Sequence, residues 1–204
     1  MKNSILKYLN ALIPEPRCEL NYNKDYELLI SVMLSAQTTD KRVNEVTSIL
    51  YSRYDDLDKL NKASVDDIED VIRPLGNQHK KAVNVKGIVS KIILNDYKLP
   101  NDRKFLESLP GVGRKTANVV LSTLFHEQCL AVDTHIARVA KRLGLALDDD
   151  DVNQIEIKLT NYFSGYDLCR LHHQLLLFGR YHCKAINPNC DCCKLRNICK
   201  KKLD

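Results

Sequence analysis

The sequence predicts an all-α protein. Apolar residues recur at helical spacing along almost the whole chain, and no alternating apolar and polar stretch is bounded by hairpin turns. The chain has 204 residues, of which 44% are hydrophobic, so it can bury a substantial core as one domain or as two small ones. We therefore expect a globular protein built from helices alone.

The apolar spacing places ten helices along the chain. No internal repeat and no low-complexity linker interrupts them. In chain order, the expected helices are Ile5 to Leu12, Asp25 to Ser35, Asp40 to Tyr54, Val65 to Ile72, Lys80 to Leu94, Phe105 to Leu109, Lys115 to Phe125, His135 to Leu143, Val152 to Tyr162 and Leu168 to Arg180.

Polar residues mark the beginning of two of these helices. Ser64 precedes Asp66 and Asp67, a pattern that is typical of an N-cap followed by acids in the first turn. Asp133 or Thr134 is the expected cap of the eighth helix. Both helices therefore have a defined start in the sequence.

Prolines and one acidic run mark breaks between helices. The run Asp148–Asp151 is most simply a solvated loop followed by a helix start, rather than a cation site. Further breaks are expected at Pro74, Pro100 and Pro110.

Composition points to a soluble protein. No run of eighteen or more apolar residues occurs, and the segment from Met1 to Pro14 is too polar for a secretory signal. We expect a cytoplasmic monomer with no membrane partner, associated with the nucleoid if the source is bacterial. The formal net charge of +5 is compatible with a polyanionic partner but is weak evidence for one.

Eight cysteines in a chain without an export signal favour metal ligation or reduced thiols over disulfides. Four of them, Cys183, Cys190, Cys193 and Cys199, are separated by six, two and five residues, so one small loop can present all four thiolates to a single centre. Four thiolates suit tetrahedral zinc or a [4Fe–4S] cluster, and this chemistry does not choose between them. The neighbouring Cys192 is a spare thiol, and the remaining three are expected to be small buried hydrophobes: Cys18, Cys129 and Cys169.

A glycine-rich turn before the seventh helix has the features of a phosphate site. Gly111 and Gly113 allow the backbone to turn tightly and to approach a ligand closely. The apolar run after Arg114 opens a helix whose N-terminal N–H groups face an anion. Lys115 follows at once, and Asp133 adds a carboxylate eighteen residues later. This combination indicates chemistry on nucleic acid.

Four ordered motifs together resemble the endonuclease III family of DNA glycosylase/AP lyases, within the helix-hairpin-helix superfamily. The resemblance covers nearly the whole chain. Its motifs are residues 34–40 (LSAQTTD), the hairpin that contains Lys115, residues 132–135 (VDTH) and the C-terminal cysteine loop in the family's own spacing.

The resemblance implies a two-lobed fold. A six-helix barrel would span residues 20–126 and include the helix-hairpin-helix at about 103–125. Residues 1–19 and 127–204 would form a second helical lobe, with the cluster loop at 183–199. Lys115 and Asp133 would face each other across the cleft, and the cysteines would hold a [4Fe–4S] cluster.

Base removal followed by strand cleavage needs a nucleophile that displaces the base at C1′ and stays attached as an imine, which a lysine amine can do. We assign this role to Lys115, whose pKa would be lowered by burial, by Arg114 and by the positive end of its helix. Asp133 would accept a proton and stabilise positive charge on the deoxyribose. β-Elimination from the Schiff base would then break the 3′ phosphodiester bond.

The resemblance also supplies candidate DNA contacts. Gln37 matches the residue that fills the gap left by an extruded base. Asn77 stands where the family commonly has a bulky apolar side chain, so Leu75 is the alternative wedge. The full expected set is Gln37, Leu75, Asn77, Gly111, Val112, Gly113, Arg114, His135 and Lys184.

We therefore expect a bifunctional DNA glycosylase/AP lyase of base excision repair that acts on oxidised pyrimidines and abasic sites in double-stranded DNA. One alternative is an adenine glycosylase of the same superfamily, against which Ser31 and Lys115 argue. Another is a non-catalytic helix-hairpin-helix protein with a structural metal site, which would need no carboxylate matched to the lysine. An electron-transfer iron–sulfur protein is a third, against which the hairpin argues, because such a protein would have no use for it.

Overall fold

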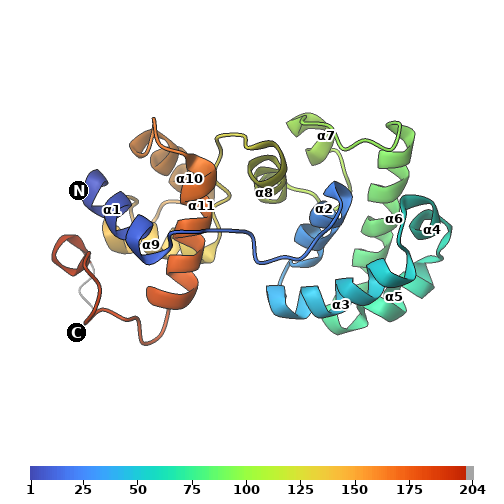
Figure 1. Cartoon of the computed structure of the whole chain (residues 1–204), viewed down its shortest axis with the longest axis horizontal. Helices are drawn as coiled ribbons and strands as arrows, with labels where there is room; N and C mark the ends of the chain where they lie inside the picture. Colours follow the sequence, from blue (N-terminus) through green and yellow to red (C-terminus); the bar gives the residue numbers. More distant parts are fainter. Residues whose placement is uncertain (201–204) are drawn as a thin grey trace. The chain divides into compact units, whose positions relative to one another are not determined.

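The computed structural model describes residues 1–200, and every regular element in that range is helical (Figure 1). The all-α prediction is confirmed. The α-helices are α1 (Lys2–Leu12), α2 (Asp25–Leu34), α3 (Asp40–Arg53), α4 (Leu57–Lys62), α5 (Val65–Ile72), α6 (Gln78–Leu94), α7 (Arg103–Glu107), α8 (Arg114–Phe125), α9 (Thr134–Leu143), α10 (Val152–Tyr162) and α11 (Leu168–Leu177). Shorter helical segments are η1 (Arg73–Leu75), η2 (Phe178–His182) and η3 (Arg196–Ile198).

Two details correct the expected helices. The sequence pattern missed α4, a six-residue helix capped by Asp56, whose side chain accepts a hydrogen bond from the Lys59 amide at 2.6 Å. The last expected helix was to reach Arg180, but α11 ends at Leu177 and the chain continues through a π-helical segment, Phe178–His182. Neither change follows from apolar spacing, because α4 is too short to show a period and η2 is apolar on the same side as α11.

The chain divides into two compact units. The central unit comprises Glu19–Phe125, and the terminal unit comprises Met1–Cys18 together with the chain from His126 onward. The last four residues of the expected second lobe, 201–204, lie outside the described residues. In the terminal unit α1 packs against α11, so residues from opposite ends of the chain share one core (Figure 1). Its fully buried members include Ile5, Leu9, Ile136, Val139, Leu171 and Phe163.

Helix α2 lies at the centre of the central unit. Every residue from Tyr26 to Leu34 is buried, as expected for a helix that is apolar on nearly all sides. Helices α3, α6 and α8 pack around it. Its polar members are hydrogen-bonded, since the Glu27 carboxylate accepts from the Asn23 amide at 2.7 Å and Ser31 Oγ lies 2.9 Å from Tyr51 Oη.

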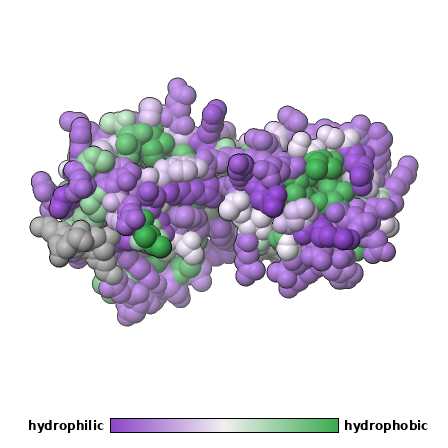
Figure 2. Space-filling view, turned by 90° about the horizontal axis from the view of Figure 1, so that it is seen from below, coloured by the Kyte–Doolittle hydropathy of each residue, from purple (hydrophilic) through white to green (hydrophobic). Residues whose placement is uncertain are grey.

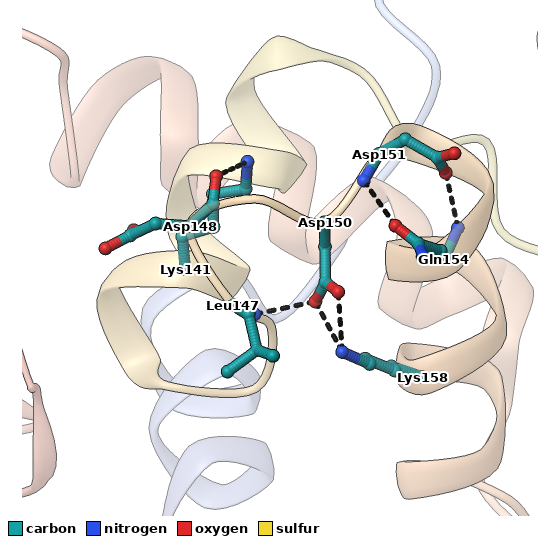
Figure 3. Close-up of polar contacts among 7 residues, drawn as sticks. All are labelled: Lys141, Leu147, Asp148, Asp150, Asp151, Gln154 and Lys158. Carbon is teal, nitrogen blue, oxygen red and sulfur yellow. Dashed lines mark hydrogen bonds and ion pairs between the residues drawn. The ribbon is translucent and has the colours of Figure 1, made fainter.

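The acidic run Asp148–Asp151 leads into the start of α10, as expected, but it is not solvated throughout, because Asp150 is buried (Figure 3). The buried Asp150 carboxylate accepts from Lys158 Nζ at 2.6 Å and from the Leu147 amide at 2.6 Å. Asp151 and Gln154 form a capping box at the start of α10.

Hydrophilic residues cover most of the face drawn in Figure 2, and its hydrophobic areas are small and separate. Within residues 1–200, none of the helices combines the length and the apolarity that a membrane crossing requires.

Asp150→Asn should lower the midpoint of thermal unfolding at pH 7. The Lys158 ammonium, and then the Leu147 amide, hold the pKa of the Asp150 carboxyl below its ordinary value of 3.8. A lowered carboxyl pKa stabilises the fold above about pH 4 and stops doing so as the pH falls below that value. The difference between variant and wild type should therefore shrink from pH 7 to pH 3. Asp149→Asn, an exposed neighbour, is the control, and an equal effect of both variants would contradict this account.

Candidate active site

The hairpin turn between α7 and α8 is fixed against α6 and α2. Gly111 has a φ of +75°, and a Cβ there would lie 2.3 Å from Asn84 Nδ2 and 3.2 Å from Met33 Cγ. The position therefore needs glycine both for its backbone conformation and for space. Val112 is buried, and its amide donates to the Leu109 carbonyl at 3.1 Å. Contacts with Asn84 on α6 and Met33 on α2 thus fix one side of the turn.

The far side of the same turn is open. Nothing lies within 4 Å of a Cβ built on Gly113. Gly113, Arg114 and Lys115 are all exposed, and Arg114 begins α8. Backbone N–H groups at a helix start are anion donors, so this surface can take a phosphate. The burial expected around Lys115 is wrong within the central unit: any desolvation of its amine must come from outside that unit.

Asp133 belongs to the terminal unit, where it caps α9. One of its carboxylate oxygens, Oδ1, accepts from the Ile136 amide at 2.8 Å. The side chain is half-buried. Of the two expected caps, Asp133 is the one used, and the cap engages a single carboxylate oxygen. Because Lys115 and Asp133 lie in different units, their approach to each other stays a prediction.

An arginine links the start of α9 to the cysteine loop. Arg138 Nη2 lies 3.3 Å from His135 Nδ1 and donates to the Gly179 carbonyl at 2.7 Å. The same guanidinium donates to the Cys183 carbonyl, at 3.2 Å from Nε. Gly179 packs closely here, since a Cβ on it would lie 2.9 Å from His135 Cβ. His135 is therefore tied to the cysteine loop, two residues from Asp133.

The four clustered cysteines line one pocket that is partly open to solvent. Arg142 closes one side: its guanidinium lies 3.4 Å from Cys183 Sγ and donates to the Lys184 carbonyl at 2.7 Å. Burial raises the pKa of the Cys193 thiol. Leu143, Phe178 and Leu195 are the main apolar walls.

The donor set fits an iron–sulfur cluster. Four thiols around one apolar-walled cavity are the usual ligands of such a cluster. Among residues 1–200, no three His, Cys, Asp or Glu side chains meet closely enough to hold a single metal ion. Lys184, the expected phosphate contact, is exposed next to Cys183.

The remaining expected DNA contacts lie on two turns of the central unit. Gln37 (φ 58°) follows α2, and Asn77 (φ 48°) precedes α6; both side chains are exposed. Leu75, by contrast, is only 4% exposed. Its side chain is part of the core, so the suggestion that Leu75 is the wedge is wrong for this conformation, because a wedge must reach the surface.

Sequence reasoning missed Lys81, whose ammonium joins these two turns. Its Nζ donates to the Ala36 carbonyl at 3.0 Å and to the Leu75 carbonyl at 2.9 Å. One signal was present: Lys81 stands at helical spacing from Val85 and Ile88, on the apolar stripe of α6. A lysine on such a stripe is a candidate for a buried, hydrogen-bonded charge.

Comparisons with known proteins define the class. The family model of HhH-GPD superfamily base excision DNA repair proteins matches residues 30–164. Endonuclease III of Bacillus subtilis (strain 168) is 40% identical over 198 residues, 96% of this chain and 90% of its own length. Endonuclease III of Escherichia coli (strain K12) is 41% identical over 204 residues, 98% of this chain and 96% of its own. The chain belongs to the endonuclease III family.

Solved structures agree with this assignment. A non-covalent endonuclease III–DNA complex matches with a TM-score of 0.92 at 40% identity and covers 97% of this chain and 93% of its own. A trapped covalent endonuclease III–DNA intermediate matches with a TM-score of 0.91 at 40% identity, over 98% and 96%. A thermostable thymine-DNA glycosylase, at 22% identity and a TM-score of 0.82, shares the fold.

Substitution of the two hairpin glycines should separate folding from surface access. Gly111→Ala should lower the free energy of unfolding by about 1–3 kcal/mol, because it combines a left-handed backbone with a collision against Asn84. Gly113→Ala should leave stability nearly unchanged, since its Cβ meets nothing. Urea unfolding measures both. Equal destabilisation by the two substitutions would contradict this description of the turn.

Proposed function

We propose that the chain is a bifunctional DNA glycosylase/AP lyase of base excision repair that removes oxidised pyrimidines, such as thymine glycol, from double-stranded DNA and cleaves abasic sites. The observation that carries this proposal is Lys115, exposed at the start of α8 directly after an open glycine turn. A phosphate held at Gly113 and Arg114 would bring the sugar of the same strand to the lysine amine. The trapped covalent complex of a relative supports covalent chemistry on DNA in this family.

In the proposed reaction, Lys115 Nζ attacks C1′ and the damaged base leaves with its bonding electrons. Asp133 accepts the proton that the amine releases and stabilises positive charge at the sugar. The C1′–O4′ bond of the sugar then breaks, O4′ takes a proton, and the C1′ amine becomes an imine, which acidifies the C2′ protons. Loss of one of them expels the 3′ phosphate, which breaks the strand without water.

The base must leave the helical stack before Lys115 can reach C1′. We assign Gln37 and Asn77 to the gap, because both side chains are exposed at the tips of turns. Gly111, Val112, Gly113 and Arg114 form the phosphate turn. His135 supports Asp133 through Arg138, and Lys184 adds a phosphate contact beside the cysteine loop.

Cys183, Cys190, Cys193 and Cys199 would hold the [4Fe–4S] cluster. The cluster would fix the loop from Lys184 to Asn189, which lies between two of its ligands. Arg142, with its bonds to Cys183 Sγ and to the carbonyls of the loop, orients this segment. Because its substrate would be chromosomal DNA, the protein would act at the nucleoid if the source is bacterial.

Borohydride trapping tests the nucleophile. Wild type should form a covalent adduct with a duplex that contains an abasic site or thymine glycol, and Lys115→Ala should form none, because no imine can form. Lys104→Ala is the control, since it removes an exposed lysine from α7 of the same hairpin. An adduct in Lys115→Ala equal to that of wild type would overturn the assignment. Binding without any adduct in wild type would favour the non-catalytic alternative.

Two substitutions at Asp133 should separate catalysis from capping. Asp133→Asn keeps an acceptor for the Ile136 amide, so stability should change little, while the rate should fall about 10²–10⁴-fold for loss of the carboxylate. Asp133→Ala should lose the rate and also about 1 kcal/mol of stability. Single-turnover rates and thermal unfolding measure the two effects. An active Asp133→Asn enzyme would show that Asp133 is a cap only.

Metal analysis of the protein purified without oxygen tests the cofactor. Wild type and Cys192→Ser should be brown, with iron and sulfide in about a four-to-four ratio per chain. Cys190→Ser should lose most of both, because Cys190 lines the cavity and Cys192 is exposed outside it. A colourless protein with one zinc per chain would instead establish the zinc alternative.

A further inference from the structure

Lys81 is a buried charge that no part of the reaction above uses. It lies in the first turns of α6 with only 6% of its surface exposed. Its ammonium donates to the carbonyls of Ala36 and Leu75, at 3.0 Å and 2.9 Å, and lies 3.4 Å from Thr38 Oγ1. Three acceptors satisfy the three N–H donors of an ammonium. Burial of a charge is costly, and here neutral loop oxygens are its partners.

The acceptors come from two turns whose tips are strained. Gln37 has a φ of 58° and Asn77 a φ of 48°, in the left-handed region that residues with a side chain rarely adopt. Both tips are exposed. A second bond joins the same turns, from Thr38 Oγ1 to the Leu75 carbonyl at 2.9 Å. The side chains of Lys81 and Thr38 thus bridge the turn after α2 and the turn before α6.

We propose that Lys81 is a positioning residue that locks these two turns together, so that Gln37 and Asn77 enter the gap left by an extruded base at a fixed separation. This inference rests on the proposed function, because it requires those two side chains to contact DNA. Lys81 itself touches neither the DNA nor the reacting atoms. Its ammonium acts by hydrogen-bonding the carbonyls of Ala36 and Leu75, which precede Gln37 and Asn77 in the two turns.

A consequence distinguishes this role from general stabilisation. Filling the gap matters only where a base has to leave a duplex, since an abasic site in single-stranded DNA has no stack to replace and no orphaned partner. Loss of the lock should therefore slow excision of thymine glycol from duplex DNA, while imine formation at a single-stranded abasic site should stay near the wild-type rate.

The test compares Lys81→Met with Lys86→Met in the full-length, cofactor-loaded protein. Lys86 lies on the same helix, and its ammonium likewise bonds two carbonyls, those of Asn61 and Ala63, but not the two turns. Lys81→Met should reduce single-turnover excision in duplex DNA about tenfold to hundredfold, as expected for hydrogen bonds to a charged group. Borohydride trapping on the single-stranded abasic site should change less than about twofold in both variants. If Lys81→Met does not fold, Thr38→Val, which removes the second bridge, replaces it with the same expected selectivity.

A double-mutant cycle with Gln37→Ala adds a second readout. If Lys81 acts through the tips, the loss in Lys81→Met with Gln37→Ala should be smaller than the product of the single losses. Equal losses on both substrates, effects matched by Lys86→Met, or fully multiplicative losses would overturn the positioning role. Failure of the proposed function would look different, because wild type itself would then give no adduct on either substrate.

Discussion

Burial of helix α2 sets the position of two turns of the central unit to which we assign DNA contacts. The helix is surrounded by α3, α6 and α8, and its last turn leads directly into the turn that carries Gln37. Met33, also on α2, lies under the hairpin at Gly111. One apolar helix therefore supports both the hairpin turn at Gly111 and the turn that carries Gln37. A shift of α2 would move both, while a change in surface charge would move neither.

The terminal unit relies on arginine to backbone bonds instead. Arg138 and Arg142 stand one turn apart on α9 and together bind the carbonyls of Gly179, Cys183, Lys184 and Ala185. The cysteine loop has little regular structure, so these guanidinium groups supply the donors that a helix or sheet would otherwise provide. They also connect the loop to the helix that Asp133 caps. The proposed cluster and the proposed catalytic carboxylate are thus parts of one packed framework.

Local patterns explain what the sequence predicted well. The caps at Ser64 and Asp133 depend on residues within four positions, and both form where the sequence predicts a helix start. The cysteines that line one cavity are likewise close in sequence. Features that join distant segments were not predictable in this way. The burial of Leu75 and the bonds from Lys81 to residues 36–38 depend on how α6 packs against the turns around it. The exposure of Lys115 depends on which distant segments of the chain lie over the start of α8.

The composition of the terminal unit from both ends of the chain has a consequence for biosynthesis. Its core joins Ile5 and Leu9 to residues from 130 onward, so α1 has no core partners until that later part of the chain has been made. The central unit is continuous and can fold first. The hairpin would then be complete before the cysteine loop closes, and any metal would be taken up last. A newly made molecule would pass through a state with a finished hairpin turn but without the segment that carries Asp133, the carboxylate that we propose as the partner of Lys115.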